Sequence, residues 1–200
     1  MKGFLIVFEG IDRAGKKTQV KLLTERLKGE GYKVEKLSFP DYSTPLGKEI
    51  KAFLDGKRDY NTQVRHILYA ANRWERKDDL EKWLKDGRMV VVDRYYQSNL
   101  AYGTANNLDL NWLLNLEKGL PKEDLVIILD ISPETSFVRK GVGRDLYERD
   151  LTFLGKVREA YHHLAERFGW VIVNGERKIE EVHNEVWRII QELLKSPQMV

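Results

Sequence analysis

The segment that most constrains this chain is a glycine-containing loop between an apolar run and a helix-like stretch. The loop and its flanks read Phe8-Glu9-Gly10-Ile11-Asp12-Arg13-Ala14-Gly15-Lys16-Lys17-Thr18-Gln19. Gly10 and Gly15 permit a tight path on which backbone N–H groups converge on a polyphosphate, and the helix N-terminus adds positive potential. Lys16 can then reach the phosphate being transferred. The order of strand, loop and helix favours a phosphate-binding loop over an ordinary glycine turn.

One position in this loop departs from the usual pattern. A Ser or Thr that ligates magnesium normally follows the loop lysine, whereas this chain has Lys17 there and Thr18 one place later. A protonated lysine supplies charge but no lone pair for a metal. The loop therefore supports nucleotide binding more strongly than it supports the usual magnesium geometry.

The composition favours a single enzyme domain over residues 1–200. A chain of 200 residues with 42% apolar content can bury one sizeable core. The absence of cysteine excludes disulfides, thiolate catalysis and cysteine-bound metals, and a net charge of +3 is too small to indicate a nucleic-acid partner. The apolar run near Phe4 is too short for a signal sequence or a membrane span, so we expect a cytoplasmic protein with no membrane partner.

Short apolar runs alternate with amphipathic stretches, which is typical of a parallel sheet covered on both faces by helices. The expected strands are Phe4–Glu9, Val34–Phe39, Met89–Asp93, Leu125–Asp130 and Val171–Asn174. The expected helices are Lys16–Glu30, Thr62–Lys85, Pro133–Arg139, Leu151–Phe168 and Ile179–Lys195. The predicted fold class is α/β, a three-layer P-loop NTPase fold with a five-stranded parallel sheet flanked by helices. Ligands of such sheets bind beyond the carboxyl ends of the strands.

A carboxylate and a guanidinium emerge together after the expected strand Met89–Asp93. The Asp93 carboxylate can orient magnesium or its water shell, and the planar Arg94 guanidinium can hold an acceptor phosphate through two hydrogen bonds. An Asp-Arg pair is also a common surface ion pair. The presence of the phosphate-binding loop in the same chain favours the functional interpretation.

Tyr69 and Arg73 lie four residues apart in an expected helix and therefore share one face. An aromatic ring beside a long donor can stack on a nucleotide base and bind its edge. The residues alone favour a simpler alternative, in which Tyr69 packs in the core and Arg73 pairs with a carboxylate.

Taken together, these segments resemble thymidylate kinase, a P-loop nucleoside-monophosphate kinase family. The resemblance covers nearly the whole chain and includes the FEGIDRAGK loop, the segment 39–44, the ANRWE helix, the DRY turn, the segment 120–125, Tyr147-Glu148 and the helix 156–161. It implies ATP-dependent phosphorylation of dTMP to dTDP by direct in-line transfer, with Mg²⁺, in a homodimer. No covalent enzyme intermediate is needed for this reaction.

The resemblance also implies roles for individual residues. Tyr69 would stack on thymine, Arg73 would bind its edge, and Tyr102 would crowd the 2′ position of the sugar. The expected acceptor-binding residues are Asp12, Phe39, Tyr69, Arg73, Arg94, Ser98, Tyr102 and Tyr147. The expected ATP-binding residues are Gly10, Asp12, Arg13, Ala14, Gly15, Lys16, Lys17, Thr18 and Arg139. The expected catalytic residues are Arg13, Lys16, Asp93, Arg94 and Arg144, with Asp93 as the metal ligand.

The run 139–144 combines glycines with three cations between two expected helices, which suits a lid near 139–149 that closes over ATP. The alternative is a solvated basic loop. Arg13 and Arg144 are both available to stabilise the transferring phosphoryl group, and the sequence does not choose between them. Arg139 or Lys140 is also a candidate to lie against adenine, with backbone near Asn174 and Gly175 at the adenine edge.

A second departure from the family pattern falls in the segment that begins at Phe39. Many relatives carry an arginine four residues into this segment, where this chain has Tyr42. Tyr42 and Lys17 together leave open a non-catalytic nucleotide-binding protein. Another nucleoside-monophosphate or deoxynucleoside kinase also stays open, because a fold and a phosphate-binding loop do not determine the acceptor.

Overall fold

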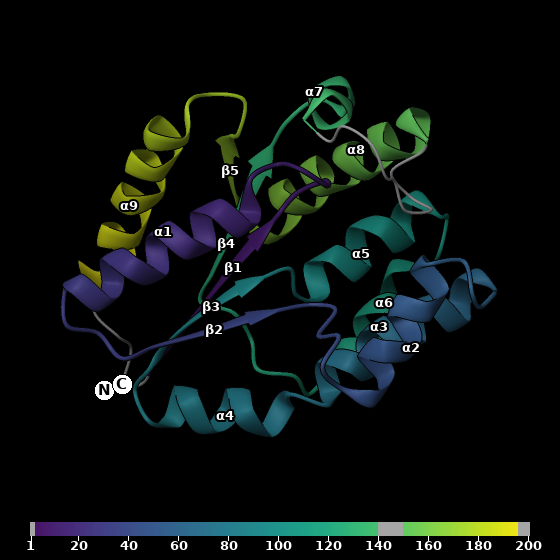
Figure 1. The fold of residues 1–200 in the computed structure, drawn as a ribbon, viewed down its shortest axis with the longest axis horizontal. Coiled ribbons are helices and arrows are strands. Elements are labelled where there is room, and N and C mark those ends of the chain that lie inside the picture. Colours follow the sequence, from purple (N-terminus) through teal and green to yellow (C-terminus); the bar gives the residue numbers. More distant parts are fainter. Residues whose placement is uncertain (1–2, 140–149, 196–200) are drawn as a thin grey trace.

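The computed structural model describes residues 3–139 and 150–195. Five parallel strands form one sheet in the order β2-β3-β1-β4-β5. They are β1 (Phe4–Glu9), β2 (Val34–Ser38), β3 (Met89–Asp93), β4 (Leu125–Asp130) and β5 (Val171–Asn174). The predicted α/β class, the five strands and their parallel arrangement are confirmed (Figure 1).

The strands form the sheet because their apolar runs are buried on both faces. Leu5, Phe8 and Val91 in the central strands β1 and β3 are fully buried, as is Leu129 in β4. The edge strand β2 contains both polar and apolar residues and is only partly covered, and it has a single neighbouring strand. The core therefore lies along β1, β3 and β4.

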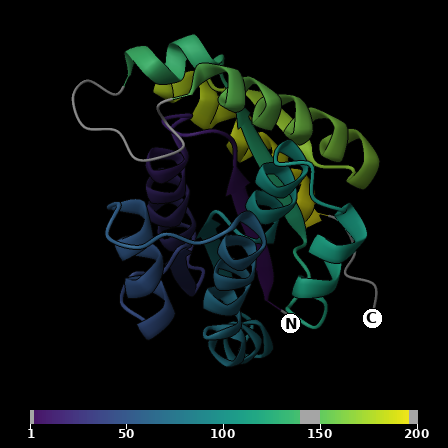
Figure 2. The same ribbon diagram turned by 90° about the vertical axis from the view of Figure 1, so that its right-hand side faces the viewer.

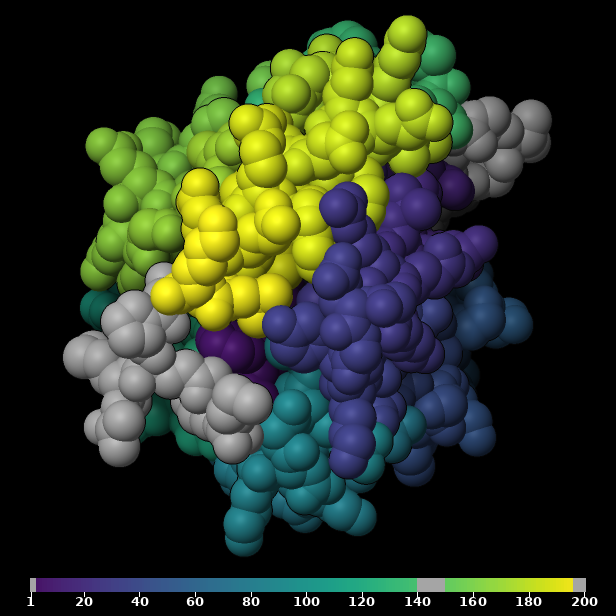
Figure 3. Space-filling view, turned by 90° about the vertical axis from the view of Figure 1, so that its left-hand side faces the viewer, coloured from purple at the N-terminus to yellow at the C-terminus, as the bar shows by residue number. Residues whose placement is uncertain are grey.

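Helices cover both faces of this sheet. They are α1 (Lys16–Gly29), α2 (Pro45–Leu54), α3 (Thr62–Trp74), α4 (Lys77–Lys85), α5 (Tyr96–Ala105), α6 (Leu110–Glu117), α7 (Pro133–Val138), α8 (Leu151–Phe168) and α9 (Ile179–Lys195). Figure 2 shows α1 and α5 on opposite sides of the sheet, with α8 beside α5. In the space-filling view of Figure 3, the yellow surface of α9 lies beside the purple-blue surface of α1, and the Arg26 guanidinium sits 4.1 Å from the ring centroid of Trp187 at this contact.

The single helix expected over Thr62–Lys85 is wrong, because the chain divides there into α3 and α4. The division falls at Glu75 and Arg76. The Arg76 guanidinium donates to Asp41 Oδ2 at 2.7 Å and to Asp79 Oδ2 at 3.0 Å. The contact with Asp41 holds the junction against a loop far away in the sequence, and helical periodicity gives no signal for such a contact.

Three helices, α2, α5 and α6, were not expected from the sequence. The reason is clearest for α5, which buries residues around much of its circumference, including Gln97, Asn99 and Leu100. A helix without a single apolar stripe gives no amphipathic signal. The ends of β2, α1 and α7 differ from the expected ends by one residue, within the usual uncertainty of element boundaries.

The sheet register brings two loops together at the carboxyl ends of the central strands. Phe8 pairs with Asp93, and the Arg94 backbone N–H donates to Phe8 O at 2.9 Å. The glycine loop after β1 and the turn after β3 are therefore neighbours. Within residues 3–139 and 150–195, none of the helices combines the length and the apolar character that crossing a membrane requires.

Candidate functional site

The two glycines of the loop occupy backbone positions that other residues rarely adopt. Gly10 has φ +129° and Gly15 has φ +99°. A Cβ atom at Gly10 would lie 2.3 Å from Leu129 O, so no side chain fits there. A Cβ at Gly15 would meet no atom within 4 Å, which means that the space over the N-terminus of α1 is open. This open space at a helix N-terminus fits a phosphate group.

Lys16 lies inside the loop rather than in solvent. Its side-chain Nζ donates to Gly10 O at 3.0 Å and to Ile11 O at 2.8 Å, and the residue is only 7% exposed. Burial and the positive charge of Arg94 lower the Lys16 pKa to about 8, although Asp12 and other carboxylates oppose this shift. The loop thus holds a cation whose burial is compensated by backbone carbonyls.

The next two residues of the loop are exposed on the first turn of α1. Lys17 occupies the position of the usual hydroxyl ligand, and Thr18 faces the cavity described below for the nucleotide. Asp93 is half-buried at the end of β3, and its charge acts to raise the pKa of Lys16. In the described part of the chain, no group of three or more acidic or histidine side chains is arranged to hold a metal ion.

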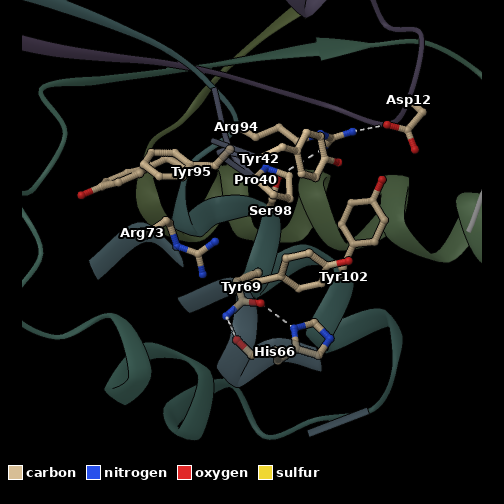
Figure 4. Close-up of a pocket in the computed structure, with 12 residues that line it drawn as sticks. Asp12, Pro40, Tyr42, His66, Tyr69, Arg73, Arg94, Tyr95, Ser98 and Tyr102 are labelled. Atoms are coloured by element: carbon tan, nitrogen blue, oxygen red, sulfur yellow. Dashed lines mark hydrogen bonds and ion pairs between the residues drawn. The ribbon is translucent and has the colours of Figure 1, made fainter. Parts of the chain in front are cut away.

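A cavity of about 130 Å³ opens beside the loop (Figure 4). Its walls are formed by Asp12, Phe39, Pro40, Tyr42, His66, Tyr69, Arg73, Arg94, Tyr95, Ser98, Asn99 and Tyr102. Every described residue of the expected acceptor set is among them. Arg144 and Tyr147, which were also expected in the site, lie outside the described residues.

Arg94 is fixed at the junction of the loop and this cavity. Its backbone has φ +65°, in the left-handed region that non-glycine residues seldom adopt. Its guanidinium Nη1 donates to Gly10 O at 3.0 Å and to Ser98 Oγ at 3.1 Å, and Nη2 forms an ion pair with Asp12. The guanidinium carbon lies 5.6 Å from the ring centroid of Tyr102. The cation is therefore oriented before any ligand arrives.

Glu9 is a functional candidate that sequence reasoning missed. Its carboxylate is fully buried and accepts from the Tyr95 and Ser98 backbone N–H groups at 2.8 and 3.0 Å. It also accepts from the Ser98 hydroxyl at 2.6 Å and from the Tyr161 hydroxyl at 2.7 Å. Glu9 thus attaches the start of α5 to β1, and Ser98 orients Arg94 while donating to Glu9. The motif contained Glu9, but its spacing carried no signal for this contact.

Arg73 combines the two interpretations that the sequence left open. It lines the cavity, and it also pairs with a carboxylate, since its Nε donates to Glu117 Oε2 at 3.0 Å. Both side chains of the pair are 3% exposed. Tyr69 is only partly buried and meets the His66 ring edge-on with a centroid separation of 6.3 Å, so it forms cavity wall rather than core. Glu117 lies in α6, a helix that the sequence did not reveal.

The segment after Phe39 is held by contacts around Asp41. The Asp41 backbone N–H donates to Asn72 Oδ1 at 2.8 Å, and its carboxylate accepts from Arg76 Nε at 2.7 Å. Hydrogen bonds from Ser43 and Arg76 outweigh partial burial and hold the Asp41 pKa below its usual value. Tyr42 is exposed at the cavity wall. Arg76, a cation that contacts this segment, is paired with Asp41.

A second cavity, of about 650 Å³, lies on the other side of the loop. It is lined by Arg13, Ala14, Gly15, Thr18, Gln19, Arg139, Gly175, Arg177, Lys178, Ile179, Glu180 and Val182. Arg139 Nη2 donates to Gly175 O at 3.0 Å, and Nη1 donates to Arg13 O at 3.4 Å, so Arg139 joins this wall to the loop. Gln19 was not foreseen, and its Nε2 donates to Ile179 O at 3.1 Å. The loop therefore separates two cavities, with Asp12 facing one and Arg13 the other.

Comparison with known proteins gives consistent results. A family model described as thymidylate kinase matches residues 8–186. The thymidylate kinase of Dictyostelium discoideum is 37% identical over 199 residues, covering 99% of this chain and 89% of that protein. The human thymidylate kinase is 37% identical over 194 residues, covering 96% and 91%. A solved structure of Candida albicans thymidylate kinase is similar with a TM-score of 0.87 at 33% identity, covering 96% of this chain and 92% of that one.

Proposed function

The chain belongs to the thymidylate kinase family, and we propose that it transfers the terminal phosphoryl group of ATP to dTMP in the space between its two cavities. The reaction is ATP-dependent phosphorylation of dTMP to dTDP. The observation that carries the proposal is the acceptor cavity, where residues from four distant parts of the chain meet beside the phosphate-binding loop. Two substrates on either side of one loop are placed for direct in-line transfer.

The acceptor cavity fits a deoxynucleoside monophosphate. In our proposal Tyr69 stacks on thymine and Arg73 binds the base edge, because both side chains lie on one face of α3 and form the same wall. Tyr102 stands near the sugar and excludes a 2′-hydroxyl by its bulk. Asp12 faces the 3′-hydroxyl, and Phe39 closes the cavity from the segment after β2.

Arg94 is the proposed clamp for the monophosphate. Its fixed backbone, the Gly10 carbonyl and Ser98 hold the guanidinium in place, so little reorganisation is needed at the moment of reaction. In the structure, Nη2 of that guanidinium forms an ion pair with Asp12. An incoming phosphate with two negative charges competes for the same donors, which frees the Asp12 carboxylate for the sugar.

The second cavity is the proposed ATP site. Gly10, Gly15 and the N-terminus of α1 receive the phosphates, and Lys16 neutralises charge on them. Arg139 and the Gly175 backbone form the opposite wall, where adenine would lie. Arg13, exposed and on the ATP side of the loop, is the described arginine placed to stabilise the transferring group.

The residues at the loop fit a magnesium ion carried by ATP. Such an ion takes most of its ligands from phosphates and water and needs only one or two protein carboxylates. Asp93 supplies one carboxylate at the end of β3, and no larger cage is required. When bound, the ion would neutralise negative charge on the phosphates. Lys17 adds charge at this position and no ligand.

We also propose a homodimer that pairs through α3 and a cytoplasmic location. Ile67 and Trp74 are 44% and 39% exposed and lie seven residues apart, so they share one face of α3. Burying these side chains against a second copy removes apolar surface from water. A monomeric mass by light scattering across micromolar concentrations would remove the dimer from the proposal.

The test of the function is a coupled assay of ADP release with dTMP, dUMP, UMP, dGMP and thymidine as acceptors. We expect the highest kcat/KM with dTMP and a lower but measurable value with dUMP, because one methyl group contributes only about 1–3 kcal/mol. Preference for another acceptor would identify a different nucleotide kinase. If none of these acceptors supports ADP release, the chain is a non-catalytic nucleotide-binding protein.

A further inference from the structure

Four buried polar side chains form one end of the acceptor cavity. His66 and Arg73 come from α3, Asn99 from α5 and Glu117 from α6, and each is at most 5% exposed. His66, Arg73 and Asn99 line the cavity, and Figure 4 labels the first two. Glu117 is outside the lining and accepts hydrogen bonds from Arg73 and Asn99. Buried polar groups of this kind have defined hydrogen-bond directions. Those directions determine what the wall offers to a base.

The Glu117 carboxylate determines which groups of this hydrogen-bond network donate and which accept. Its Oε1 accepts from Asn99 Nδ2 at 2.7 Å, and the same amide nitrogen donates to His66 O at 3.2 Å. The Asn99 oxygen must then face His66 Nδ1, at 2.6 Å, and accept its proton. Both N–H donors of Asn99 are therefore used within the wall.

Arg73 is held with one edge against Glu117 and the other edge free. Its Nε and Nη2 both donate to the Glu117 carboxylate, which is a two-point contact that fixes the plane of the guanidinium. Among the described residues, its Nη1 donates to no partner. Nη1 and the remaining Nη2 hydrogen form a second pair of donors, and a guanidinium has no acceptor.

We infer that Glu117 is a positioning residue. It fixes the Arg73 guanidinium so that this side chain presents only hydrogen-bond donors to the cavity, and the site therefore selects bases with a keto oxygen at position 4. Thymine and uracil present an acceptor at this position. Cytosine presents an amino group, whose hydrogens would face the hydrogens of Arg73 and leave buried donors unpaired. This inference rests on the proposed function, since it concerns the acceptor of the same reaction.

The wild-type protein provides the first test. The acceptors dTMP and 5-methyl-dCMP share sugar, phosphate and methyl group and differ only at positions 3 and 4 of the base. We expect kcat/KM for dTMP to exceed that for 5-methyl-dCMP by at least about 10²-fold, because a site built for hydrogen bonding rejects a ligand that leaves its groups unpaired. Values within about threefold of each other would overturn the inference.

The second test addresses Glu117 itself. In Glu117→Gln, the fixed two-point contact with Arg73 is lost, so we expect KM for dTMP to rise and the ratio of kcat/KM for dTMP over 5-methyl-dCMP to fall at least about tenfold. KM for ATP should stay at the wild-type value, because the ATP cavity lies across the loop. Glu81→Gln, which removes an exposed carboxylate on α4, is the matched control and should keep the wild-type ratio.

A purely structural role for Glu117 predicts a different result, namely a loss of activity with the acceptor ratio unchanged, and this outcome would overturn the inference. If Glu117→Gln fails to fold because Arg73 is left buried without a counter-charge, the double variant Arg73→Gln with Glu117→Gln removes both charges. The amide that Arg73→Gln introduces both donates and accepts, so we expect the acceptor ratio to approach unity. A double variant with the wild-type ratio would also contradict the inference. Failure of the proposed function is a separate result, because wild type would then not phosphorylate dTMP at all.

Discussion

At the scale of single residues, the loop lysine couples nucleotide binding to pH. Burial and Arg94 lower the Lys16 pKa from 10.5 to about 8 in the nucleotide-free protein, so Lys16 is charged below about pH 8 and progressively neutral above it. We predict that ATP affinity, measured by calorimetry, falls as the pH rises from about 7.5 to about 9.5, by at most about tenfold per unit. Lys16→Met should bind ATP weakly at every pH in this range. A constant wild-type affinity would contradict this account.

Lys17 carries the second prediction at this scale. We propose that its ammonium approaches the phosphates and replaces part of the metal charge, although it cannot join the magnesium shell. Lys17→Thr should therefore strengthen the magnesium dependence of ATP binding, and Lys17→Ala should weaken binding without magnesium. Calorimetry of wild type and both variants, with and without magnesium, measures this. Unchanged metal-free affinity in both variants would refute charge replacement.

Several functional residues escaped sequence reasoning for one physical reason, which is that their partners are distant in the chain. Glu9 acts through Ser98 and Tyr161, and Glu117 acts through Arg73. By contrast, the loop glycines lie between β1 and α1 with positive φ, the tight path that the motif predicts. Spacing along the chain reports local geometry, whereas contacts between helices depend on packing that a single sequence does not reveal.

At the scale of elements, the strands were predictable and some helices were not. The runs in β1, β3 and β4 are apolar throughout because both of their faces are buried, and this signal needs no knowledge of the partner strand. The start of α5 has no side-chain cap of its own and depends on Glu9 from β1. The break between α3 and α4 likewise depends on Arg76 and Asp41.

The dependence of α5 on Glu9 can be measured. Glu9→Gln keeps the shape of the side chain but places an amide where the carboxylate accepts from Tyr95 N, Ser98 N and two hydroxyls. We predict a loss of roughly 2–5 kcal/mol in the free energy of unfolding, determined by urea denaturation, because buried hydrogen bonds to a charged acceptor are lost. Glu25→Gln, on the exposed side of α1, should change it by less than about 0.5 kcal/mol. Equal stability of the two variants would show that Glu9 does not hold α5.

At the scale of the whole molecule, His66 makes stability depend on pH. Burial lowers its pKa to about 4, with Arg73 and Arg65 also disfavouring the charged form and Asn99 opposing the shift. The folded state therefore binds fewer protons than the unfolded state between about pH 6.5 and pH 4, and stability is lost as the pH falls through this window. The resulting loss in the free energy of unfolding amounts to about 3 kcal/mol. Urea denaturation from about pH 7 to about pH 4.5 should show this loss in wild type, and His66→Gln should show a smaller loss. Parallel curves of unfolding free energy against pH for the two proteins would exclude His66 as the source of the loss.

The overall arrangement was accessible from the sequence because a phosphate-binding loop and alternating elements determine the layers and the edge where ligands bind. The separate ATP and acceptor sites were expected only through the resemblance, since the two cavities depend on the contact of Arg139 with Gly175 and on the packing of α5 beside α3. The expected lid falls mainly in residues 140–149, outside the described residues, so its role stays a prediction. The acceptor residues were identified through resemblance, and the structure places the described ones in a single cavity.

The central claim is that this cavity accepts dTMP beside the ATP site and excludes a ribose through Tyr102. The most direct measurement is a competition in one reaction, with equal dTMP, dUMP and UMP, ATP and the purified protein, and with the three diphosphate products separated by chromatography. We predict dTDP as the main product and at least about tenfold more dUDP than UDP, since dUMP and UMP differ only in the 2′-hydroxyl and bulk at Tyr102 should cost the ribonucleotide more than about 1.4 kcal/mol; the ratio of dUDP to UDP should be smaller in Tyr102→Ala. Equal amounts of dUDP and UDP, or no diphosphate product at all, would contradict the claim.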